Sequence, residues 1–122
     1  MSSLIISKIH KVSAHGTTLY VTVPRSCYSI VSLAPFLYAY ISDNFIVYSP
    51  EPPAAKEELA GNRIVLLPAN VKSMVYRVRV AKVNSNALAL RIPAPFARIL
   101  GIVKSSYVNI ICYDSKIAVK VL

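Results

Sequence analysis

Leu19-Tyr-Val-Thr-Val-Pro24 has an echo further along the chain in Leu88-Ala-Leu-Arg-Ile-Pro93. Both stretches place apolar residues in alternation and stop at a proline, which is typical of a short β-strand that ends abruptly. The leucines and the prolines are both 69 residues apart. Such an echo is the first sign of an internally duplicated chain.

The same offset continues for about thirty positions and keeps apolar residues in register. It pairs Val31 with Leu100, Leu33 with Ile102, Tyr38 with Tyr107 and Ile41 with Ile110; after a slip of two residues, Asp43 pairs with Asp114 and Ile46 with Ile117. We therefore predict two copies of one β-rich unit, residues 1–48 and 63–122. Each copy alone would bury too little apolar surface, so the two are expected to share one core.

The elements expected in each copy are strand, turn, strand, short helix and a final β-hairpin. The expected strands are 5–12, 19–23, 37–41 and 44–48 in the first copy and 75–83, 88–92, 107–113 and 116–121 in the second. The expected helices are 26–32 and 95–100, with the polar segment 13–18 as a turn. Gly101 is expected to end the second helix.

Residues 49–62 are predicted to be a linker, because prolines cluster there before charged and small residues. One helical turn within it is conceivable. The segment Arg63–Pro68 is predicted to add a short apolar strand before the second copy.

The chain of 122 residues is strongly basic, with 14 Lys and Arg against 5 Asp and Glu, a net charge of +9. Three of the acids lie in the linker, so the remainder is more basic still. This charge favours a polyanionic partner, nucleic acid first, although a merely soluble basic protein would look similar. No apolar run approaches the roughly 20 residues that span a bilayer, and no secretion signal is visible. We expect a cytoplasmic protein that does not enter membranes.

Cys27 and Cys112 lack the close spacing of a metal or redox pair. The sequence favours two unpaired thiols in the core or in strands and leaves a disulfide open.

The second copy resembles the AbrB/MazE-like (SpoVT-AbrB) swapped-hairpin DNA-binding domains. The residues that carry the resemblance are Lys82, Ser85-Asn-Ala-Leu88, Arg91-Ile-Pro93, Leu100-Gly-Ile102 and Lys116-Ile-Ala-Val119. The first copy matches more loosely, through Lys11-Val12, Gly16-Thr-Thr-Leu19, Val23-Pro24 and Val31-Ser-Leu33. The resemblance implies a mainly β fold, a tandem swapped-hairpin β-barrel that forms an intramolecular pseudo-dimer with one short helix per repeat.

The resemblance also implies that basic strands and their turns face double-stranded DNA. In the second copy the expected DNA-binding residues are Lys82, Asn86 and Arg91, with Arg77 and Arg79 on one face of a strand. The first copy has Ser13, Thr17 and Thr22 where the second has Lys82, Asn86 and Arg91, and its basic or turn candidates are Lys8, Lys11, His15 and Arg25. This difference implies unequal half-sites or a first copy that mainly supports the second. The basic strand may equally be only a solvated face.

Two classes compete with a nucleoid-associated transcriptional regulator. An enzyme is disfavoured, because acids are few and no nucleophile motif or phosphate-cradling glycine loop occurs. We expect no cofactor, no metal and no small-molecule substrate. The stronger rival is a structural, antitoxin-like or homo-oligomeric protein that uses the same fold to assemble with a protein partner. Tyr20, Tyr38 and Tyr107 are predicted to pack in the barrel or on the sheet rather than to stack on bases.

Overall fold

The computed structural model describes residues 6–32, 35–42, 44–52, 57–60, 63–66, 75–84 and 87–122. The fold is mainly β, as the sequence predicts. The strands are β1 (Ile6–Lys11), β2 (Ser13–His15), β3 (Thr18–Thr22), β4 (Phe36–Ser42), β5 (Phe45–Ser49), β6 (Glu57–Ala60), β7 (Arg63–Leu66), β8 (Tyr76–Asn84), β9 (Ala87–Ile92), β10 (Tyr107–Tyr113) and β11 (Lys116–Val121). The helices are η1 (Arg25–Cys27, a 3-10 turn), α1 (Tyr28–Val31) and α2 (Ala94–Leu100).

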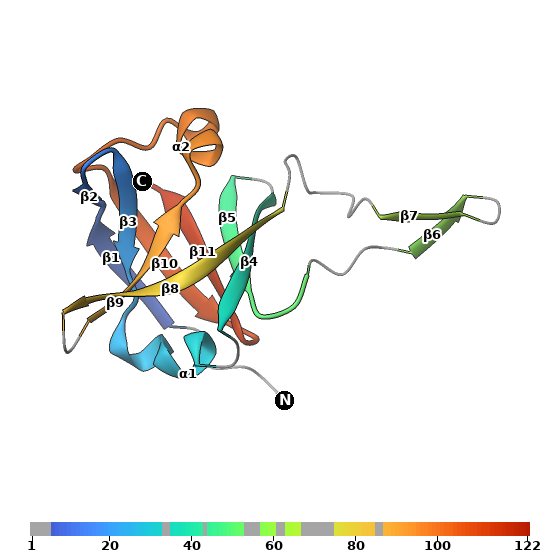
Figure 1. The fold of residues 1–122 in the computed structure, drawn as a ribbon, viewed down its shortest axis with the longest axis horizontal. Coiled ribbons are helices and arrows are strands. Elements are labelled where there is room, and N and C mark those ends of the chain that lie inside the picture. The colour runs from blue at the N-terminus through green and yellow to red at the C-terminus, as the bar shows by residue number, and fades with distance from the viewer. Residues whose placement is uncertain are drawn as a thin grey trace.

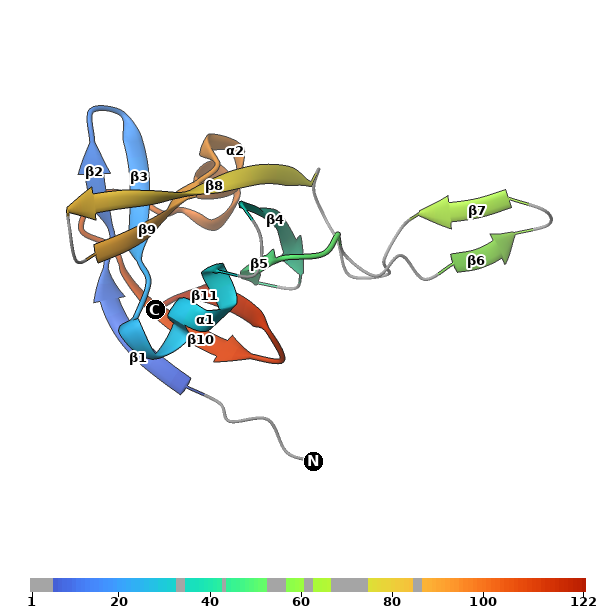
Figure 2. The ribbon, with the colours of Figure 1, turned by 60° about the horizontal axis from the view of Figure 1, so that its bottom comes forward.

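Nine of these strands form one antiparallel sheet in the order β1-β10-β11-β5-β4-β8-β9-β3-β2. The two edge strands, β1 and β2, follow one another in the chain and are separated only by Val12, so the sheet curls into a nearly closed barrel (Figures 1 and 2). Val12 is buried, its N–H donates to the Ser106 carbonyl at 2.8 Å, and its carbonyl accepts from the Ser105 N–H at 3.0 Å. The chain can therefore change partners there without leaving backbone groups unpaired.

The pairing alternates between hairpins and long-range ladders. The hairpins are β2·β3, β4·β5, β8·β9 and β10·β11, and the long-range ladders are β1·β10, β4·β8, β3·β9 and β5·β11. In every long-range ladder a strand from residues 1–49 pairs with a strand from residues 75–122. The two halves of the chain are thus joined in one sheet rather than docked as separate units.

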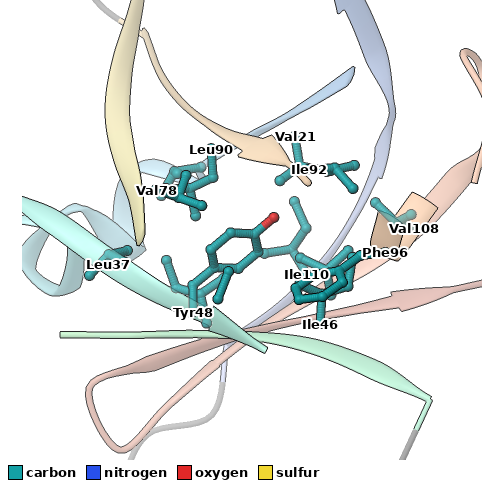
Figure 3. Packing of buried hydrophobic residues seen from close by; sticks show 14 of the residues in the cluster. Val21, Leu37, Ile46, Tyr48, Val78, Leu90, Ile92, Phe96, Val108 and Ile110 are labelled. Carbon is teal, nitrogen blue, oxygen red and sulfur yellow. The ribbon is translucent and has the colours of Figure 1, made fainter. Parts of the chain in front are cut away.

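The barrel interior is a single apolar cluster drawn from both halves. Figure 3 shows Tyr48 at its centre, with Val21, Leu90, Ile92, Ile46 and Ile110 around it. Tyr48 is completely buried, and its hydroxyl donates to the backbone carbonyl of Arg91 at 2.9 Å. The alternation of the strands explains this core, because every second side chain of a strand points to the same face.

Several elements differ from the sequence predictions in detail. Segment 13–18 is not only a turn, because Ser13–His15 forms β2 and the turn itself lies at Gly16 and Thr17. Helix 26–32 is replaced by η1 followed by a single turn of α1. Helix α2 ends at Gly101, as predicted, with a left-handed φ of 70°. Asp114 and Ser115 both have positive φ, as tight hairpin turns between antiparallel strands require.

The predicted linker contains regular structure. Its residues 57–60 are extended and form β6, which pairs with β7 in a separate two-stranded antiparallel sheet. The strand predicted at Arg63–Pro68 is confirmed over Arg63–Leu66, and its β-branched and apolar residues give the hairpin its strand propensity. At the other end of the predicted linker, Ser49 is the last residue of β5 and is buried.

The preference for two unpaired thiols is wrong. Cys27 and Cys112 form a disulfide, with their Cα atoms 6.2 Å apart. Both cysteines are buried, as predicted, and the bond joins η1 to β10. The sequence could not reveal the pairing, because it depends on how the helical turn after β3 docks against a strand 85 residues away.

Among the residues that the structure describes, no helix is long and apolar enough to cross a membrane.

Candidate nucleic-acid interface

The first half of β8 presents two arginines on the outside of the barrel. Arg77 and Arg79 are exposed, whereas Val78 between them is fully buried, which confirms that both arginines share one face of the strand. The Arg77 guanidinium lies over the Phe36 ring of β4, 5.1 Å from its centroid. Phe36 contacts Tyr38 edge to face, with ring centroids 5.4 Å apart. This aromatic support orients one cation while leaving its donors free to contact an anion.

The second half of β8 turns away from β4 and pairs with β9. A register shift between Lys82 and Asn84 marks a β-bulge, a device that bends a strand and redirects its side chains. Lys82 is exposed there and lines an open hollow of about 280 Å³. The hollow is lined by Ser13, Ala14, His15, Tyr20, Ala81 and Lys82.

Arg91 lies beside this hollow on β9. It is exposed and directly opposite Tyr20 in the β3·β9 ladder, and the next outward-facing pair of that ladder is Thr22 opposite Ala89. Because Tyr20 lies between Ser13 of β2 and Arg91 of β9, one row of side chains crosses three strands. The structure therefore brings Arg91 and Lys82 to the same four-stranded part of the sheet.

The first half of the chain contributes fewer cations to this region. Lys11 is exposed at the end of β1, opposite Tyr107. Lys8 is exposed three residues earlier and so points to the other face, together with His10. Burial, and secondly the charge of Lys8, lower the pKa of His10, so this imidazole is neutral at pH 7. Arg25 is exposed on η1, away from the strands that line the hollow.

Two turns were predicted to face DNA. In the first, His15 and Thr17 are exposed on either side of Gly16, whose φ of 64° suits glycine. In the second, Asn86 lies outside the described residues.

Sequence reasoning missed Ala81 and undervalued Tyr20. Tyr20 packs on the outside of the sheet at the hollow rather than in the core; its alternation with Leu19 and the fully buried Val21 could have indicated this. Tyr107 is 56% exposed, so packing is the wrong prediction for its side chain. The inward positions of β10 are instead taken by Val108 and Ile110.

Electrostatically, the hollow beside Arg91 has no carboxylate in its lining. Glu51 and Asp114 line a different hollow, formed by the end of β5 and the β10–β11 turn. Within the described ranges, no three His, Cys, Asp or Glu side chains are grouped so as to hold a metal ion. The arrangement around Lys82 can hold an anion through Lys and Arg and offer hydrogen bonds from Ser13, His15 and Tyr20.

No family model, no curated protein and no solved structure matches this chain.

Proposed function

We propose that this protein binds double-stranded DNA and regulates transcription in the cytoplasm, as a tandem AbrB-like repeat whose halves form a swapped-hairpin pseudo-dimer. DNA is contacted by the outer face of β2, β3, β8 and β9, without a cofactor. The observation on which the proposal rests is the acid-free hollow on this face, with Lys82 in its lining and Arg91 beside it.

The strand registers support a duplication. Moving β1 forward by 68 residues and β10 back by 71 turns the pair Lys11↔Tyr107 into Arg79↔Phe36, which is a pair of the β4·β8 ladder. Val108↔His10 becomes Leu37↔Val78 in the same way. The shift of 71 also maps every pair of the β4·β5 hairpin onto a pair of β10·β11.

The registers also refine the alignment of the two copies. The shift is 68 residues before the bulge in β8 and 69 after it, so Lys82 corresponds to Ala14 rather than to Ser13. The slip to 71 comes before β4, because Leu37 and Val108 are equivalent inward positions. On this alignment, exchanging the two halves returns the pair Val21↔Leu90 to itself, so a pseudo-twofold axis passes there.

The hollow lies across this pseudo-twofold axis. Four of its lining residues form two equivalent pairs, Ser13 with Ala81 and Ala14 with Lys82. A duplex has local twofold symmetry of its own, and DNA-binding dimers commonly align their axis with it. An exposed basic face centred on such an axis therefore fits a duplex.

The first test is a salt titration of binding to random-sequence duplex DNA. We expect affinity to fall steeply and log-linearly with salt, because each neutralised phosphate contributes a slope of about −0.9. A complete lack of binding at low salt would overturn the proposed function.

The second test locates the interface. The double variant Lys82→Ala/Arg91→Ala should weaken binding and reduce the magnitude of the salt slope by about 2. The matched control, Lys104→Ala/Lys120→Ala, removes the same charge from exposed positions outside the hollow and should change binding less. Equal losses in the two double variants would contradict the assigned face.

A second candidate function is assembly with a protein partner or a second copy. It is favoured by three large exposed apolar side chains on neighbouring strand ends: Ile9 at 64%, Tyr107 at 56% and Leu122 at 65% exposure. Light scattering of the free protein distinguishes this candidate, because a stable homo-oligomer would give a multiple of the 13.4 kDa chain mass.

A further inference from the structure

We infer that the protein binds DNA in a single orientation, on a site that is not palindromic, because the two halves of its pseudo-twofold face differ in chemistry. The inference rests on the proposed DNA binding and specifies the class of site that this face would select.

The difference is sharpest beside the axis. Val21 and Leu90 lie on it with their side chains buried, and the neighbouring positions of both strands face outward. On one side Tyr20 faces Arg91; on the other, the equivalent pair is Ala89 and Thr22. A bulky aromatic ring and a guanidinium therefore oppose a methyl group and a small hydroxyl across only two ladder positions.

The same imbalance extends outward along both arms. Lys82 corresponds to Ala14, and Arg77 corresponds to Ile9, on the registers given above. Only one basic pair is shared between the copies, Lys11 with Arg79, and both of its members are exposed. The backbone is thus nearly symmetric, while three of the four cations on the β8–β9 arm have no basic equivalent on the β1–β3 arm.

This combination has a definite consequence for recognition. The shared pair anchors either arm to phosphate, which fixes position without reading sequence. Arg91 is the side chain best suited to bidentate contact with guanine, and Thr22 at the equivalent place can make only a weaker, less selective contact. Turning the protein around on the same site would exchange Arg91 for Thr22 and Lys82 for Ala14. The two orientations therefore differ in energy on any sequence that Arg91 reads.

The experiment has two stages. Selection of bound duplexes from a random-sequence library gives the preferred site, which we expect to lack twofold symmetry. A cleavage reagent of the iron–EDTA type is then attached at Thr17→Cys, in the exposed turn between β2 and β3. This thiol would be the reactive one, since Cys27 and Cys112 are bonded to each other and buried.

With one protein bound per duplex, cleavage should occur at one end of the site only. Cleavage of equal strength at both ends, or a palindromic consensus, would overturn the single orientation and leave DNA binding itself intact. Failure of the library to yield any bound duplex would overturn both.

A gain-of-function variant tests the cause. Thr22→Arg supplies the equivalent of Arg91, and we expect it to raise affinity for a palindrome built from the Arg91-side half-site by roughly tenfold. The same variant should lessen the orientation preference on the original site. Asn44→Arg adds the same charge in the exposed β4–β5 turn and should do neither. If both variants raise affinity for the palindrome equally, added charge alone is responsible and the inference fails.

Discussion

At the scale of single residues, Tyr48 links the core to the DNA-binding face. Its buried hydroxyl donates to the carbonyl of Arg91, the residue whose side chain points outward at the proposed interface. Tyr48→Phe removes the donor with little change in shape and leaves that carbonyl without this bond. We expect a loss of about 1–2 kcal/mol in the free energy of unfolding, measured by denaturant titration. Tyr107→Phe, at an exposed ring, is the control and should change stability by less than about 0.5 kcal/mol.

His10 gives the fold a pH dependence of known sign. Its pKa is lowered in the folded state, first by burial and then by Lys8, so the unfolded chain binds the proton more readily. Stability contributed by the neutral imidazole is present above its ordinary pKa of 6.5 and is lost as the pH falls below that value towards the folded pKa. The thermal midpoint should drop between pH 7.5 and 5.5, and His10→Gln should flatten the drop. An unchanged drop in His10→Gln would assign the effect to another group.

At the scale of elements, Gly101 illustrates a turn that only backbone freedom allows. It ends α2 with φ of 70°, and no atom would collide with an added Cβ. Gly101→Ala should therefore cost about 1 kcal/mol through backbone strain alone. Gly101→Asn should cost less, because asparagine tolerates the left-handed region better. Equal losses for both variants in thermal unfolding would contradict this explanation.

The elements that could be predicted from sequence are those with strong alternation or clear stop signals. Strands β10 and β11 lie at their predicted bounds, and α2 ends where Gly101 indicates. Strand β2 escaped prediction because Ser13–His15 is polar and gains its extended shape from pairing with β3. The bulge after Lys82 has no local signal either. The basic candidates were visible as charges, but the hollow that unites Lys82 with Tyr20 depends on tertiary pairing.

At the scale of the whole molecule, the disulfide ties the two halves of the chain to each other. Cys27 follows β3 in the first half and Cys112 lies on β10 in the second, 85 residues apart. A crosslink over so long a loop restricts the unfolded chain strongly, with an upper estimate of about 4 kcal/mol on the chain-entropy account. Strand pairing already joins the halves through four long-range ladders, so the reduced chain should keep its fold and lose stability. Denaturant unfolding of the oxidised protein and of Cys27→Ser/Cys112→Ser should differ by up to this amount, with the same circular dichroism spectrum when folded. Mass spectrometry after alkylation without reductant is the direct check: two modified thiols in the folded protein would refute the crosslink, and an unfolded double variant would mean that the ladders alone cannot hold the two halves together.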